Sequence, residues 1–248
     1  SFISLKVIEL YTRARELCQQ LGETRQLFHV LYGLRTIHQV HGEFLAAREL
    51  GEQLLALAQR EQDSALQVEA QWALGSTCFN LGEFSAAQMH LAQGMTLYDV
   101  RGHPSQELLY GMATEVLGFL YAAWVLWHLG YPAQALKKSQ EARILAQERS
   151  HPFGLASAQA FAAMLHQLRR ESVLTRECAE AGISLAHEHG FPVFLGQGAV
   201  LQGWGLTDQG QTEEGFTQIH QGLTTSKAKG IGWCQSYNLA LLAEAYER

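Results

Sequence analysis

The segment HGEFLAA at residues 41–47 decides the fold, because close copies of it return along the chain. The copies read LGEFSAA at residues 81–87, LGYPAQA at 129–135 and QGQTEEG at 209–215, and a weaker one surrounds Arg170. Their second positions are 42, 82, 130, 170 and 210, at intervals of 40, 48, 40 and 40 residues. A recurring period of this length is typical of repeat proteins, whose units stack side by side.

Each interval holds two helical patterns that meet at the turn residue. A glycine there supplies the left-handed backbone that ends one helix, and the following residues begin the next. Pro152 and Pro192 suit the first turn of a helix, and Asp63 before Ser64 predicts a helix N-cap. The expected helices span residues 3–20, 24–40, 43–60, 64–80, 83–98, 106–128, 132–148, 152–168, 172–188, 192–208, 212–228 and 232–247.

Composition supports an all-α chain. The 248 residues include only 4 prolines, and Ala, Leu, Gln and Glu, which favour helices, dominate. No run of β-branched residues alternates with polar ones, so no strand is predicted. The hydrophobic content of 47% is ample for a core.

Small residues at two repeat positions identify the type of repeat. Seven residues before the turn the chain carries Gly75, Ala123, Ala163 and Gly203, with Arg35 as the exception, and five residues after it Ala47, Ala87, Ala135, Thr175 and Gly215. Small side chains at both positions let two helices cross closely, as in tetratricopeptide pairs. The sequence therefore predicts a tetratricopeptide-like, right-handed superhelix of helical hairpins (an α-solenoid) with repeats of about 40 residues.

One repeat domain is expected over residues 1–248. Its parts are a half repeat at 1–20, repeats at about 24–60, 64–98, 106–148, 152–188 and 192–228, and a half repeat at 232–248. The chain does not begin with Met and stops just before the next expected turn, which predicts a fragment of a longer chain. The single long interval predicts an insertion around residues 99–110, either a binding loop, a hinge or a former linker.

Charge, apolar runs and cysteines exclude several classes of protein. The net charge is −6 and Lys and Arg form no cluster, so no nucleic-acid partner is expected. The longest apolar stretch, residues 117–127, is too short to cross a bilayer, which takes about 20 residues. The four cysteines are scattered without metal-site or disulfide spacing, which predicts reduced thiols and a cytoplasmic location.

No pattern in the chain predicts catalysis. It has no phosphate-binding loop, and the glycines at 196 and 198 lie inside a predicted helix without the third glycine of a dinucleotide site. A nucleophile elbow is also missing. The histidine pairs His38/His41 and His187/His189 have no evident third ligand, so no metal is expected. We therefore expect neither enzyme activity nor a cofactor in this chain.

The inner face of the superhelix is the predicted binding surface, because the first helix of each pair lines it. The inward positions hold His29, Tyr32, Gln39, Glu69, Trp72, Phe79, Asn80, Trp124, Trp127, His128, Gln167, Gln197, Trp204 and Asp208. Aromatic anchors with a few polar groups are typical of a peptide-binding groove. The predicted partner-binding set is Tyr32, Trp72, Phe79, Asn80, Trp124, Trp127, His128, Gln167, Trp204 and Asp208. The alternative for each aromatic ring is packing between neighbouring helices.

Several segments also carry a resemblance to a known family. They are residues 74–75 with 81–84, 122–124 with 129–132, 151–153, 164–170, 203–204 with 209–210, and 241–246. Together they resemble the C-terminal tetratricopeptide region of bacterial multidomain ATPases of the AAA/STAND type, especially those with an N-terminal class III adenylate/guanylate cyclase domain. The resemblance covers essentially the whole chain and departs from the family at Arg35 and around residues 99–110.

Three functions remain open for this chain. The resemblance implies a non-catalytic regulatory arm that binds a protein or peptide, or neighbouring domains of its own chain. A free-standing adaptor is the second possibility, and the small-molecule-sensing arm of a transcriptional activator is the third. The domains on either side of the chain would separate these alternatives.

Overall fold

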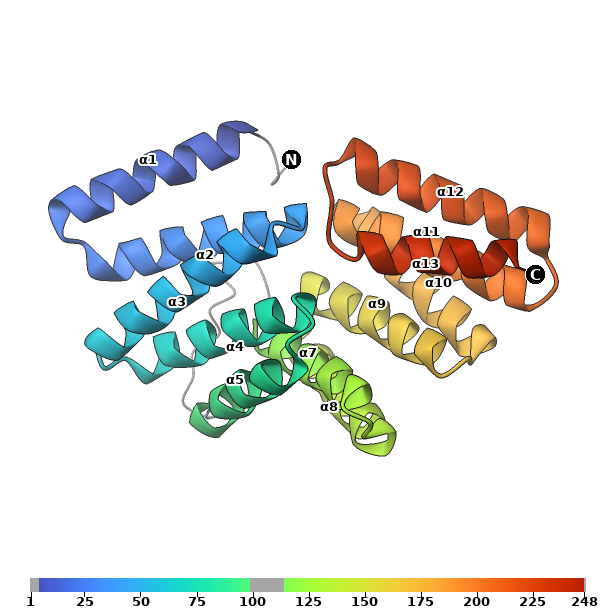
Figure 1. Cartoon of the computed structure of the whole chain (residues 1–248), viewed down its shortest axis with the longest axis horizontal. Coiled ribbons are helices and arrows are strands. Elements are labelled where there is room, and N and C mark those ends of the chain that lie inside the picture. Colours follow the sequence, from blue (N-terminus) through green and yellow to red (C-terminus); the bar gives the residue numbers. More distant parts are fainter. Residues whose placement is uncertain (1–4, 99–113, 248) are drawn as a thin grey trace. The chain divides into compact units, whose positions relative to one another are not determined.

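Helical hairpins follow one another along the chain in the computed structural model, which describes residues 5–98 and 114–247 (Figure 1). Within those residues there are twelve helices and no strands. Neighbouring helices pack against each other from α1 (Leu5–Leu21) through α5 (Phe84–Leu97) to α7 (Thr114–His128), and from α9 (Pro152–Leu168) to α13 (Gln235–Tyr246). The first helices of successive pairs also touch, as α4 (Ser64–Asn80) does with α7 and α11 (Pro192–Asp208) with α9. The predicted all-α helical repeat fold is confirmed.

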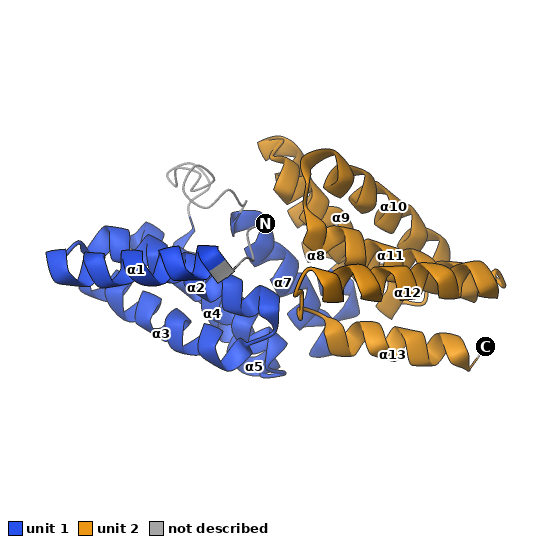
Figure 2. Ribbon diagram, turned by 90° about the horizontal axis from the view of Figure 1, so that it is seen from above, with its two compact units in different colours: residues 1–135 blue, residues 136–248 orange. Residues whose placement is uncertain are grey.

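The chain forms two compact units, residues 1–135 and residues 136–248 (Figure 2). The helices that belong to the first are α1 (Leu5–Leu21), α2 (Thr24–His41), α3 (Phe44–Arg60), α4 (Ser64–Asn80), α5 (Phe84–Leu97) and α7 (Thr114–His128). The dividing point lies in the first turn of α8 (Pro132–Arg149). The second unit continues with α9 (Pro152–Leu168), α10 (Ser172–His189), α11 (Pro192–Asp208), α12 (Thr212–Ala228) and α13 (Gln235–Tyr246).

Most predicted helix ends lie within one or two residues of the observed ones. The predicted helix at 106–128 is described only from Thr114, and the insertion around residues 99–110 lies outside the described residues. The predicted start of the last helix at 232 is wrong, because α13 begins at Gln235. Gly230 and Cys234 both have positive φ there, and Trp233 between them is buried and stacks on Phe161 at 5.7 Å. Burial of this tryptophan fixes a non-helical turn.

The repeated turns end their helices in the same way. Gly42, Gly82, Gly130 and Gly210 have φ between 79° and 85°, in the left-handed region that glycine adopts without strain. After each of them a backbone N–H bonds the carbonyl five residues earlier, as Glu43 does with His38 at 2.8 Å. Arg170 has a φ of 62° and closes the same kind of turn without a glycine. The weaker sequence copy is therefore a structural equivalent of the others.

Helix starts also follow the sequence. The Asp63 carboxylate accepts hydrogen bonds from the backbone N–H groups of Ala65 and Leu66, at 2.9 and 3.1 Å, and so caps α4. Pro152 and Pro192 are the first residues of α9 and α11, where a missing N–H costs nothing. The predicted cap and both prolines are confirmed.

The close helix crossing is most evident between α11 and α12. A Cβ atom added at Gly203 would lie 2.5 Å from the carbonyl oxygen of Gly215, and one at Gly215 would lie 2.6 Å from the carbonyl oxygen of Gly203. A second pair, Gly196 and Gly222, makes the same kind of approach. These backbones touch directly, which only glycine permits.

Arg35, the exception among the small residues, is buried with only 5% of its surface exposed. Its guanidinium donates to the carbonyl oxygen of Ala73 at 2.6 Å and to the hydroxyl of Thr77 at 2.9 Å, both on α4. It also donates to the side chains of Gln39 and Ser76. The first pair is therefore joined to the second by a polar cluster instead of by a close backbone crossing.

Candidate partner-binding site

The ten predicted partner-binding residues lie on α2, α4, α7, α9 and α11, the first helices of their pairs. Their burial separates them into two groups. The buried ones are Tyr32, Trp72, Trp124, Gln167 and Trp204, each with at most 4% of its surface exposed. Phe79, Asn80 and Trp127 are half-buried, and His128 and Asp208 are exposed. Only the second group can meet a partner without a rearrangement of the helices.

Trp72 shows why the buried rings are closed to a partner in this structure. Its ring centroid lies 5.2 Å from that of Tyr98. Added Cβ atoms at Gly94 on α5 and Gly118 on α7 would come within 2.6 and 2.8 Å of the indole. The two glycines thus make room for the ring between three helices. Trp72 therefore packs between neighbouring helices, which was the alternative to partner binding for each aromatic ring.

The buried polar residues of the first unit bond to one another. Gln39 on α2 donates to the hydroxyl of Tyr121 on α7 at 3.1 Å. Glu69 on α4 accepts from the hydroxyl of Thr114 at 2.7 Å. Burial raises the pKa of the Glu69 carboxyl to about 8, while the Thr114 hydrogen bond lowers it. The carboxyl is therefore largely protonated at neutral pH, as a core carboxyl with no cationic partner among the described residues should be.

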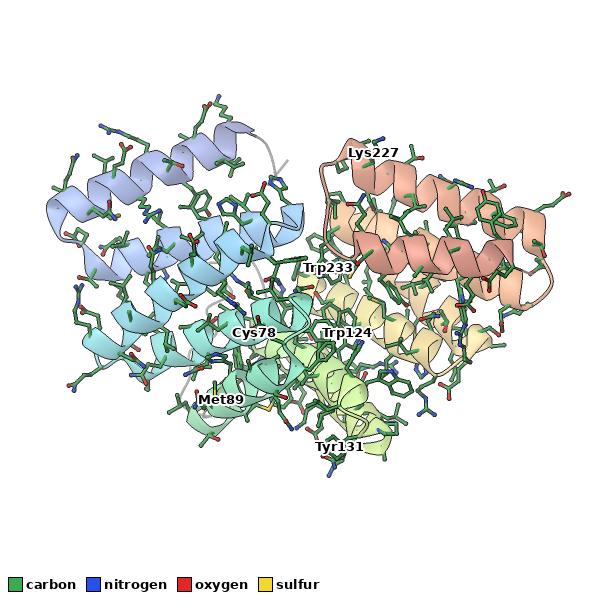
Figure 3. The ribbon with its side chains drawn as sticks, viewed as in Figure 1. Cys78, Met89, Trp124, Tyr131, Lys227 and Trp233 are labelled. Carbon is green, nitrogen blue, oxygen red and sulfur yellow. The ribbon has the colours of Figure 1, made fainter. Side chains whose placement is uncertain are left out.

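Rings from α4, α5 and α7 form an aromatic cluster, defined here as Phe79, Phe84, Tyr121, Trp124 and His128. Phe79 lies at its centre, with ring centroids 5.2 to 5.8 Å from the other four. Tyr121 and Trp124 anchor the cluster in the core, with 5% and 2% of their surfaces exposed. Trp124 is labelled in Figure 3. Phe79 and Phe84 are half-buried and His128 is exposed, so the cluster runs from core to surface.

His128 is held in place from two sides. Its Nδ1–H donates to the carbonyl oxygen of Trp124 at 2.8 Å, one turn earlier on α7. Its ring stacks on Phe84 with centroids 4.7 Å apart and an interplanar angle of 29°. A neutral ring bonded in this way keeps Nε2 as a hydrogen-bond acceptor. The exposed end of the aromatic cluster thus presents a stacked pair of rings and one hydrogen-bond acceptor.

Sequence reasoning missed two members of this cluster. Phe84 belongs to the repeated turn segment, but it lies on the second helix of its pair and was therefore not counted among the inward residues. Tyr121 lies three residues before Trp124, on the same face of α7. The recurrence of Phe at positions 44 and 84 was the signal for Phe84.

The second unit places its predicted residues in other surroundings. Gln167 on α9 accepts from the hydroxyl of Tyr237 on α13 at 2.7 Å. Trp204 is fully buried, and the guanidinium of Arg170 lies 5.9 Å from its ring centroid. Asp208 is exposed at the end of α11.

Among the described residues, no three His, Cys, Asp or Glu side chains come together in a way that could hold a metal ion. None of the helices in residues 5–98 and 114–247 is long and apolar enough to span a membrane.

Comparison with known proteins finds likenesses among solved structures. No protein-family model matches the sequence, and no curated protein matches it. The chain is similar to the crystal structure of BtubC (BKLC) from P. vanneervenii, with a TM-score of 0.61. The two share 17% of aligned residues over 89% of this chain and 90% of the other. At that identity the likeness shows the fold alone.

Proposed function

We propose that this chain is a non-catalytic regulatory module that binds a protein or peptide within a larger bacterial signalling ATPase or nucleotide cyclase in the cytoplasm. Three observations support the proposal: the helical repeat fold, the sequence resemblance, and a prepared aromatic surface in the first unit. Repeat stacks offer large, continuous faces to partners and deform through small shifts between units, which suits a regulatory arm.

The aromatic cluster is the observation on which the proposal depends most. Its buried rings are fixed by the core, so Phe84 and His128 reach the surface at little entropic cost. Half-buried Asn80 and Trp127 lie on the same ends of α4 and α7 and add a polar amide and an indole. A partner segment would pack an apolar or aromatic side chain on the Phe84 and His128 rings. Rigid aromatic anchors of this kind contribute most of the energy in many interfaces.

The experiment is an affinity pulldown from the source cells with the wild-type chain and a Phe84→Ala, His128→Ala variant as bait. A Tyr131→Ala variant is the matched control, because Tyr131 is an exposed aromatic ring outside the aromatic cluster, with 49% of its surface exposed. Thermal unfolding by circular dichroism checks that all three baits are folded. We expect a partner that the wild type and Tyr131→Ala retain and the double variant loses.

Other outcomes reject parts of the proposal. A partner retained equally by all three baits would place binding elsewhere on the chain. If the wild type retains nothing, the same baits are tested against the remaining domains of the parent chain. Failure there as well would favour the small-molecule-sensing arm over a protein-binding module.

A further inference from the structure

A cavity of about 400 Å³ opens between α3, α4 and α5 of the first unit. Helix α3 contributes one face with Arg48, Glu52, Leu55, Ala56 and Gln59, and the α5 side contributes Glu83, Ala86 and His90. Leu74 and Cys78 of α4 form the floor (Figure 3 labels Cys78). None of these ten residues belongs to the aromatic cluster. The cavity is therefore a separate site from the one proposed above.

The floor and the rim differ in chemistry. Leu74 and Cys78 have 3% and 4% of their surfaces exposed, and with Leu55 and Ala86 they present an apolar surface. The rim carries the charged and polar side chains of the lining. Such an arrangement suits a ligand with a hydrocarbon part and one polar end.

The charges of the rim favour a cation. The only cationic side chain in the lining, Arg48, is paired with the Glu83 carboxylate across the cavity. Burial is the main cause that raises the pKa of the Cys78 thiol, while a hydrogen bond from Arg48 lowers it. The charge of Glu52, which makes no ion pair within the described residues, also raises that pKa and so acts on the floor of the cavity. One carboxylate of the lining is thus left without a countercharge. A positively charged group would be attracted and an anion repelled.

His90 adds an acceptor on the opposite wall. Its Nδ1 lies 2.7 Å from the Oε1 of Gln71, which can only accept, so Nδ1 carries the proton. Burial and the charge of Arg48 lower the pKa of His90, which keeps the ring neutral at pH 7. Its Nε2 therefore has a lone pair available to an N–H donor. The rim combines a carboxylate and an imidazole acceptor above an apolar floor.

We propose that this cavity binds an alkylammonium group, with its hydrocarbon stem on Leu55, Leu74 and Ala86 and its nitrogen between Glu52 and the Nε2 of His90. An ammonium has three donors, which match these two acceptors and leave one for water. The group is carried either by a free linear polyamine or by a lysine side chain of a peptide. The site binds such a group whether or not the aromatic cluster binds a partner.

Cys78 provides the readout, because it forms part of the cavity floor. The rate of its alkylation by iodoacetamide is measured by peptide mass spectrometry with and without millimolar spermidine, and with a capped lysine tetrapeptide. Cys178 is an internal control, since it is also buried but does not line the cavity. We expect one or both amines to slow alkylation of Cys78 and to leave Cys178 unchanged. The more effective probe identifies the source of the group.

Variants test which residues hold the nitrogen. Glu52→Gln should weaken the protection of Cys78 about fivefold, as the loss of a partly exposed ion pair predicts. Glu49→Gln is the control, because Glu49 is an exposed acid on the same helix outside the lining. Isothermal titration calorimetry of the same variants with spermidine gives the affinity independently.

Three results would overturn the proposal. They are no protection of Cys78 by either amine, equal protection by a neutral alcohol of the same length, and equal losses in Glu52→Gln and Glu49→Gln. None of these results bears on the aromatic cluster, so the two proposals can fail separately.

Discussion

At the scale of single residues, Arg35 is the most informative. An arginine keeps its charge at any accessible pH, and a buried charge needs compensation. Here the compensation comes from neutral acceptors: an amide, two hydroxyls and the carbonyl of Ala73. Burial lowers the pKa of Arg35, while the neighbouring Tyr32 and Tyr121 raise it. The cluster fixes the register of α2 against α4, because each acceptor belongs to one position on its helix.

Replacement of Arg35 by Ala should lower the free energy of unfolding by about 3 kcal/mol. The change leaves buried acceptors without donors and opens a cavity between α2 and α4. Urea denaturation followed by circular dichroism measures the loss. Arg60→Ala is the control, since its side chain is 65% exposed and should change stability by less than about 0.5 kcal/mol. Equal effects of the two changes would contradict the structural role of Arg35.

At the scale of elements, two of the turns between paired helices are held by the same side-chain contact. Glu171 accepts from His166 at 2.7 Å and from the guanidinium of Arg169 at 2.7 and 3.0 Å. His38 bonds Glu43 at the equivalent place in the first pair. These hydrogen bonds, chiefly those from Arg169, lower the pKa of Glu171 to about 2. The contact joins the end of one helix to the start of the next.

The stabilisation by Glu171 should depend on pH in a defined window. Its folded pKa lies below the ordinary value of 4.5, so the stabilisation is complete above pH 4.5 and is lost as the pH falls towards about 2. Glu171→Gln should therefore lower the free energy of unfolding by about 1 kcal/mol at pH 7 and by almost nothing near pH 2. Urea denaturation across this range measures the difference.

An exposed acid on α10, the helix that begins directly after Glu171, serves as the control. Glu177→Gln, at an exposed position of α10, should stay within about 0.5 kcal/mol of the wild type throughout. A constant difference between Glu171→Gln and the wild type over the whole range would show that the carboxylate charge is not what stabilises the turn.

The crossing of α11 and α12 is the second element-scale test. An added methyl group at Gly203 meets backbone atoms at 2.5 and 2.8 Å, whereas one at Gly182 on α10 finds its nearest neighbour at 3.5 Å. Gly203→Ala should therefore destabilise the protein by about 1–3 kcal/mol, and Gly203→Leu by more. Gly182→Ala should instead stabilise it by up to about 1 kcal/mol through helix propensity. Thermal unfolding distinguishes a loss of stability from a gain. A change of the same sign in both variants would show that the close crossing of α11 and α12 does not lie at Gly203.

At the scale of the whole molecule, the contacts inside each compact unit join most helices chiefly to their neighbours along the chain. Stability in such an arrangement is close to a sum of local terms. Gly203→Leu should therefore speed amide hydrogen exchange in α11 and α12 and leave α2 and α3 unchanged. Mass spectrometry of exchanged peptides measures this pattern. Faster exchange in all helices would instead show that the chain unfolds as one cooperative unit.

The sequence by itself determined the helices, their turns and their order. The reason is that these features are local: Gly42 and Gly82 end helices through their own φ, and Pro152 and Pro192 start them through theirs. The period of 40 residues then predicted which helices pair with each other, because the small residues before and after each turn must meet where the two helices cross.

The tertiary structure alone decided which side chains of a shared face are accessible. Helical periodicity put Trp72, Trp204 and His128 on the inward face, but it does not say how closely the neighbouring helices approach. Gly94 and Gly118 let helices close over Trp72, whereas His128 at the end of α7 stays exposed. The burial of Arg35 and the presence of the cavity above Cys78 also follow from contacts between helices. Burial is a property of the assembled helices, and the spacing of residues along one helix cannot specify it.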